Sequence, residues 1–99
     1  MAEERYGLRL QTENYRPTKS EAIDSIDYSP KAKIIEIEFK DDGIYHYLDA
    51  KKTEWKKMLE FVENKKGLGG YVNQTFKEPY KKREREYYRL IVLEEKSNT

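Results

Sequence analysis

The chain has 99 residues, no cysteine, and charged side chains at 39% of its positions, with a formal net charge of +1 at pH 7. The absence of cysteine excludes a disulfide scaffold, a thiolate metal site and a cysteine nucleophile. No apolar run approaches the roughly eighteen residues that a membrane span requires, and the N-terminus MAEERYGLRL is too charged for a signal peptide. We therefore expect one small cytoplasmic domain with no membrane contact.

The charge is unevenly distributed along the chain. Residues 1–50 hold 7 basic and 11 acidic side chains, whereas residues 51–99 hold 13 and 8. The densest basic stretch is KEPYKKREREYYR, residues 77–89, and Glu84 and Glu86 interrupt it. These carboxylates moderate the positive field that a polyanion would meet.

The first third of the chain predicts two extended segments. Within residues 1–19, Tyr6, Leu8 and Leu10 alternate, which is typical of an edge strand but also compatible with a mobile arm. Residues 20–28 predict the first secure strand, with Ile26 and Tyr28 on one face. A turn at residues 29–32 follows, because Pro30 presets φ for a type I turn.

Residues 33–49, KIIEIEFKDDGIYHYLD, predict a β-hairpin. A three-residue loop at residues 41–43 would pair Phe39 with Tyr45 and place Tyr45 and Tyr47 on the apolar face. His46 would then lie outside, beside Glu38. A two-residue loop would exchange the two faces, because a slip of one residue reverses every side chain. The Asp-Asp-Gly order favours the three-residue form.

Residues 51–66 predict an amphipathic helix, because Trp55, Met58, Leu59 and Val62 fall on one stripe. Asp49 or Thr53 would cap its start, and Gly67 would take the left-handed conformation at its end. Residues 67–70 predict a flexible loop. They lack the lysine and serine that follow a phosphate-binding loop.

The end of the chain predicts a helical turn over residues 71–77, which Pro79 ends, and a strand over residues 86–94. This strand is apolar on both sides, and the N-terminal piece is our candidate to cover its second side. The fold class is therefore α+β: a three- to four-stranded antiparallel meander with one amphipathic helix on one face, a short second helical turn and an added C-terminal strand.

Residues 20–80 resemble the KTSC domain, which is named after the C-terminal domain of some lysyl-tRNA synthetases and also occurs as small free-standing proteins. The resemblance rests on Ala22-Ile23, Ile26 and Tyr28 before a proline turn, Phe39, Gly43, Tyr45-His46-Tyr47, Trp55, Leu59, Tyr71-Val72-Asn73 and Tyr80. It divides the chain into an N-terminal arm (1–19), the KTSC-like domain (20–80) and a C-terminal strand and tail (81–99). The resemblance implies a small α+β domain of uncharacterised function, for which RNA binding is suggested by its place on a synthetase.

The family-motif residues Tyr45, Tyr47, Tyr71 and Asn73 have structural as well as functional interpretations. The two hairpin tyrosines could stack on bases, but the register favours packing under the helix. Asn73 is expected to bond local backbone. His46 is expected to be an exposed cross-strand residue, because the sequence offers it no second metal ligand and no nucleophile.

Two functions of different classes follow, and neither is enzymatic or needs a cofactor or metal. In the first, the domain binds RNA, with cations pairing with phosphates and an aromatic ring stacking on bases; the predicted residues are Lys77, Tyr80, Lys81, Lys82, Arg83, Arg85 and Arg89. In the second, it binds a protein through a sheet edge or through an outer apolar face. That face would comprise Tyr87, Arg89, Ile91 and Leu93. The chain would be a monomer or a weak homodimer.

Overall fold

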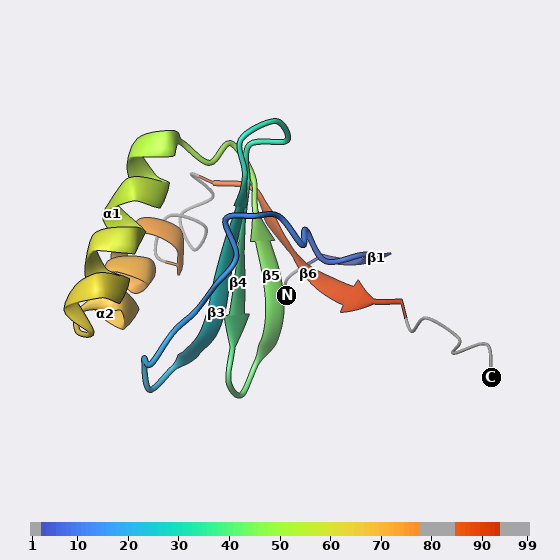
Figure 1. Ribbon diagram of the computed structural model, residues 1–99. Coiled ribbons are helices and arrows are strands. Elements are labelled where there is room, and N and C mark those ends of the chain that lie inside the picture. Colours follow the sequence, from blue (N-terminus) through green and yellow to red (C-terminus); the bar gives the residue numbers. More distant parts are fainter. Residues whose placement is uncertain (1–2, 78–84, 94–99) are drawn as a thin grey trace.

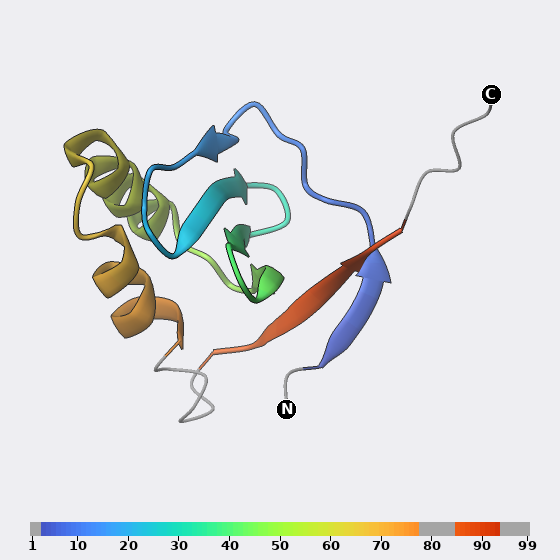
Figure 2. The same ribbon diagram turned by 90° about the horizontal axis from the view of Figure 1, so that it is seen from below.

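A computed structural model describes residues 3–77 and 85–93 of the chain. It contains a curved sheet with two helices on one side (Figures 1 and 2). In chain order the elements are β1 (Glu4–Gly7), β2 (Arg16–Pro17), β3 (Ile23–Ser29), β4 (Ile34–Phe39), β5 (Gly43–Tyr47), α1 (Lys52–Asn64), α2 (Leu68–Val72), η1 (Asn73–Lys77, a π-helical turn) and β6 (Tyr87–Val92).

The strand order in the sheet is β1-β6-β5-β4-β3-β2. The predicted antiparallel meander is present as β3, β4 and β5, and β6 extends it by antiparallel pairing with β5. The α+β class is confirmed. The expected strand number and purely antiparallel pairing are wrong, because β1 pairs with β6 in parallel and β2 adds a sixth strand.

The hairpin of β4 and β5 has the predicted facing of its side chains but a different register. Tyr45 pairs with Ile37 and Tyr47 with Ile35, so each tyrosine lies two residues from its predicted partner. The cause is that Gly43, at φ +98°, already pairs with Phe39, and the loop therefore comprises residues 40–42. A shift of two residues preserves the face, so both tyrosines still lie on the helix side.

Helix α1 packs its apolar stripe on this face. Trp55 and Met58 are buried, and the Trp55 ring stacks on Tyr28 with 5.5 Å between centroids. The predicted N-caps are wrong, and Gly67 takes the predicted left-handed conformation at the start of α2 and not at the end of α1. The N-cap residue is Lys51, whose N–H donates to the Glu54 carboxylate, and the left-handed residue at the C-terminus is Lys65.

Residues 67–70 do not form the predicted loop, because Leu68 already begins α2. Leu68 and Val72 are buried beneath α1, and Phe76 from η1 is fully buried against Tyr47, with ring centroids 5.2 Å apart. A second apolar segment therefore completes the layer on this side of the sheet. No helix among the described residues is long and apolar enough to cross a membrane.

The N-terminal segment forms an edge strand and then crosses the sheet, whereas the sequence pattern left a strand and a mobile arm as alternatives. Residues 4–7 form an edge strand beside β6 rather than a cover over it. Residues 8–15 of the N-terminal arm then cross the sheet face opposite the helices to reach β2 (Figure 2). Contacts from this arm to β3 and β4 bury polar side chains there.

Candidate functional site

The sequence-predicted basic residues do not form one open cationic surface within the described residues. Tyr80, Lys81, Lys82 and Arg83 lie outside the described ranges. Lys77, Arg85 and Arg89 are described, and each has an internal partner. The contacts of these three residues decide whether their charges remain available to a phosphate.

Arg85 is the most enclosed of the three. Its guanidinium forms an ion pair with Glu54 on α1, donates to the carbonyl of Leu48 at 3.3 Å, and lies 4.8 Å above the ring of Phe76. Its side chain is only 12% exposed. Arg85 therefore joins the start of β6 to α1, and its charge is already neutralised.

Arg89 and Lys77 are half-buried. Arg89 Nη1 lies 3.2 Å from Glu4, and its Nε is buried without an acceptor beside Gly43. A side chain at Gly43 would come within 3.0 Å of that nitrogen, so the glycine leaves space for the arginine as well as supplying positive φ. Lys77 Nζ lies 4.3 Å from the ring centroid of Phe39, a cation–π contact.

The family-motif tyrosines belong to the core. Tyr47 is 1% exposed and Tyr45 is 9% exposed, and both stack on Tyr87 from β6. The preference for core packing over a stacking platform is therefore confirmed. Because Tyr87 faces the core, it does not belong to the outer apolar face that the sequence suggested.

Tyr71 and Asn73 follow the junction between α1 and α2. The ring of Tyr71 packs on Phe61 at 5.2 Å, and burial raises the pKa of its hydroxyl. Asn73 is exposed, and its backbone N–H donates to the carbonyls of Gly69 and Gly70 at the end of α2. Asn73 therefore stands at the end of α2, and the predicted bond from its side chain to local backbone stays a prediction.

The prediction that His46 is exposed is wrong. It faces away from the helices as predicted, yet it is 3% exposed. Its Nε2 lies 2.7 Å from the Glu36 carboxylate and its Nδ1 lies 2.8 Å from the Tyr88 hydroxyl. The residue beside it is Glu36, not Glu38, because of the two-residue register shift.

Glu36 is the centre of this buried polar cluster. It accepts hydrogen bonds from Arg9 Nε at 3.0 Å and from the N–H of Leu10 at 2.9 Å, in addition to its contact with His46. Burial alone raises the pKa of the Glu36 carboxyl, but the hydrogen bonds from His46, Leu10 and Arg9 and the Arg9 charge together lower it. Every group in the cluster already has a partner.

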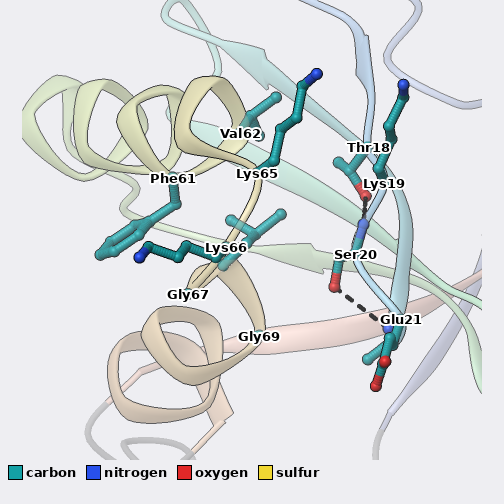
Figure 3. A pocket seen from close by; sticks show the side chains of 12 residues that line it. Thr18, Lys19, Ser20, Glu21, Phe61, Val62, Lys65, Lys66, Gly67 and Gly69 are labelled. Carbon is teal, nitrogen blue, oxygen red and sulfur yellow. Dashed lines mark hydrogen bonds between the residues drawn. The ribbon is translucent and has the colours of Figure 1, made fainter.

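A groove that the sequence analysis did not predict lies at the junction of α1, α2 and the segment before β3 (Figure 3). Its volume is about 480 Å³. Apolar side chains of Phe61, Val62 and Leu68 line it, and Lys19, Lys65 and Lys66 are exposed on its walls. We call it the lysine groove.

Local backbone geometry positions these lysines. Lys65 and Gly67 both have positive φ, +59° and +88°, so the chain reverses sharply between α1 and α2. A side chain at Gly67 would clash with the Phe61 ring at 2.9 Å, which restricts this position to glycine. Figure 3 shows the side chains of Lys19 and Lys65 on opposite walls, extending in the same direction.

The opposite wall is held by its own hydrogen bonds. The hydroxyl of Thr18 accepts from the N–H of Ser20 at 3.3 Å, and the hydroxyl of Ser20 accepts from the N–H of Ala22 at 3.3 Å. The N–H of Thr18 donates to the backbone carbonyl of Asp24 at 2.9 Å, which ties this wall to β3. The wall is therefore an ordered loop that presents Lys19.

The electrostatics of the lysine groove differ from those of the predicted basic segment. Lys19, Lys65 and Lys66 have no ion partner among residues 3–77 and 85–93. Glu21 is the carboxylate that also lines the groove, and it pairs with none of them. The site exists only because two distant segments, residues 18–22 and residues 61–69, lie together in space, and residue spacing carries no signal for it.

Fold and site together define a small α+β domain with an open basic groove and a packed aromatic core. The profile of the KTSC domain family matches residues 19–80, which is most of the chain. The chain belongs to the KTSC domain family. The KTSC domain is a domain of uncharacterised function.

A solved KTSC domain protein from Yersinia pestis has a similar structure. The alignment covers 76% of this chain and 93% of that chain, with a TM-score of 0.56 and 21% sequence identity. This similarity concerns the fold alone. No curated protein sequence matches the chain.

Proposed function

We propose that this domain binds single-stranded nucleic acid, RNA in the first place, and that it acts by binding and not by catalysis. The observation that carries the proposal is the lysine groove: three exposed ammonium groups without ion partners among the described residues, beside an apolar surface. Cations neutralise phosphates, and an apolar or aromatic surface accepts a sugar or an unstacked base.

The dimensions favour a short contact. A volume of about 480 Å³ lies within the usual range of roughly 300–1,000 Å³ for ligand sites, which suits one or two nucleotides. The groove is open along one side, and an extended strand could therefore continue past it. Single strands expose bases that duplexes bury, which supports a single-stranded ligand.

The sequence-predicted residues Lys81, Lys82 and Arg83, with Tyr80, remain a second predicted contact. Arg85 is not included in the proposal, because Glu54 already neutralises it and its side chain is 12% exposed. A binding experiment with matched variants distinguishes the two surfaces.

The test is fluorescence anisotropy with a short labelled single-stranded RNA, in a salt series from about 50 to about 200 mM. The variant K65N/K66Q removes two groove charges; asparagine suits the left-handed backbone of Lys65. We expect the slope of log K against log salt to become shallower by about 0.7 for each lost phosphate contact.

The matched control is K52Q/K56Q, which removes two exposed charges from α1 outside the groove. We expect its salt slope to equal that of the unmodified chain. K82Q/R83Q tests the second predicted contact in the same way. Absence of RNA binding at the lowest salt concentration, or equal slopes for the groove variant and its control, would overturn the proposal.

The second function class, binding of a protein, is favoured by a different observation. The predicted outer face is closed at Tyr87, which packs on the core tyrosines. Its other end, at Ile91 and Leu93, lies beside the exposed edge strand β1.

A further inference from the structure

The two edges of the sheet differ in how they are protected. The β2 edge has two paired residues, one of them Pro17, which has no N–H to offer another strand. The β1 edge has four paired residues, Glu4–Gly7, with no proline. Among the strands of the described residues, only β1 therefore presents a regular series of backbone groups at a sheet edge to an incoming strand.

The hydrogen bonds between β1 and β6 identify which backbone groups of β1 do not face β6. The carbonyl of Glu3 accepts from Arg89 at 2.8 Å, and the carbonyl of Gly7 accepts from Leu93 at 3.0 Å. Alternate residues of a strand bond to the same neighbour, so Glu3, Arg5 and Gly7 face β6. The N–H and C=O groups of Glu4 and Tyr6 consequently face outward.

Apolar side chains collect at the same edge. Tyr6 is 76% exposed, Leu8 65%, Leu93 50% and Val92 40%; these are four of the five exposed large hydrophobic residues among those described. The parallel register places Tyr6 beside Ile91. Figures 1 and 2 show β1 and the end of β6 extending away from the two helices, which leave this end of the sheet uncovered.

We propose that β1 pairs in antiparallel fashion with β1 of a second copy of this chain, around a two-fold axis at Tyr6. An axis at Tyr6 lets its outward N–H and C=O bond to the same groups of the second copy. Arg5 then faces Gly7 and Glu4 faces Leu8, so no like charges are opposed. An axis at Arg5 or at Glu4 would oppose two identical charges, which destabilises pairing.

The proposed dimer is compatible with the proposed function and independent of it. The lysine groove is lined by the segment before β3, whereas β1 lies at the other end of the strand order. Both grooves of the dimer would remain open. A monomeric chain could still bind RNA, and a dimeric chain could fail to bind it.

Sedimentation equilibrium of the full chain, from micromolar to millimolar concentration, tests the proposal. We expect the mass to rise with concentration from the 11.9 kDa of one chain toward twice that value. Tyr6→Pro removes the outward N–H and the exposed ring without removing a bond to β6. It should raise the concentration needed for dimerisation by about tenfold or more.

Two further variants keep the result interpretable. Tyr6→Lys preserves the backbone and should also weaken dimerisation. Tyr15→Lys changes the remaining exposed large hydrophobic residue, away from β1, and should leave dimerisation unchanged. A chain that keeps the mass of one copy up to millimolar concentration, or Tyr6 variants that dimerise as well as the unmodified chain, would overturn the proposal.

Discussion

The middle of the sheet is closed to water on both faces, but by opposite chemistry. On the helix side, Ile35 and Ile37 are fully buried among aromatic rings. On the other side, Glu36 and Asp27 are each 1% exposed, and the N-terminal arm supplies hydrogen bonds to both. Alternation along a strand determines which face a side chain lies on, whereas the segments that pack on that face determine whether it is exposed to solvent.

The difference has an energetic consequence. Apolar burial on the helix side is non-directional and tolerates exchanges of similar volume. Burial of Glu36 requires that its hydrogen-bond partners remain in place, because an unpaired buried charge is costly. The polar face should therefore be more sensitive to single substitutions that remove a partner.

The largest expected effect is from Glu36→Ala. It removes the acceptor of His46, Arg9 and the N–H of Leu10, and we expect it to lower the free energy of unfolding by about 3–5 kcal/mol. Urea denaturation followed by circular dichroism measures this. Glu38→Ala is the matched control on the same strand and face; its side chain is 30% exposed, and its removal should cost about 0–1 kcal/mol. Equal costs would contradict the account.

The pH dependence of stability should show a smaller effect of the Glu36 carboxylate. Because folding lowers the pKa of Glu36 below its ordinary value of 4.5, the ionised carboxylate stabilises the fold above that pH. The contribution is lost as the pH falls through the lowered pKa. The unmodified chain should therefore lose more stability than Glu36→Gln between neutral pH and pH values below 4.5. Parallel stability curves for the two proteins would refute this.

The smallest expected effect is the difference in stability cost between removing the hydroxyl of Tyr88 and removing that of Tyr45. Tyr88→Phe removes a hydroxyl 2.8 Å from buried His46 and should cost about 1 kcal/mol. Tyr45→Phe, on the helix side, removes a hydroxyl that bonds to exposed Asp42 at 3.1 Å, and should cost less, because water can replace that partner. Thermal denaturation of both variants gives the ranking, and the reverse order would count against the comparison.

Local patterns predicted the helix side well. The stripe containing Trp55 and Met58 identified α1, and the turn chemistry around Gly43 placed Tyr45 and Tyr47 toward it. These signals lie within a few residues of one another. The register differed by two residues because two placements of a three-residue loop share the same facing, and pattern alone does not separate them.

The polar side could not be predicted, because its determinants are distant in sequence. Arg9 and Glu36 are 27 residues apart, and His46 and Tyr88 are 42 apart. No sequence pattern in the N-terminal arm predicts that it crosses the sheet. The lysine groove has the same origin, since it combines residues before β3 with the α1–α2 junction. The prediction of an exposed His46 failed for this reason.

His46 also provides the most direct test of the central claim that the N-terminal arm closes the polar face. It is the only histidine in the sequence, so its imidazole N–H signal in a proton NMR spectrum needs no assignment. With Glu36 and Tyr88 bonded to its two ring nitrogens, we predict a slowly exchanging imidazole N–H signal at neutral pH, lost in Glu36→Ala. A ring N–H that exchanges too rapidly with water to be detected would contradict the account.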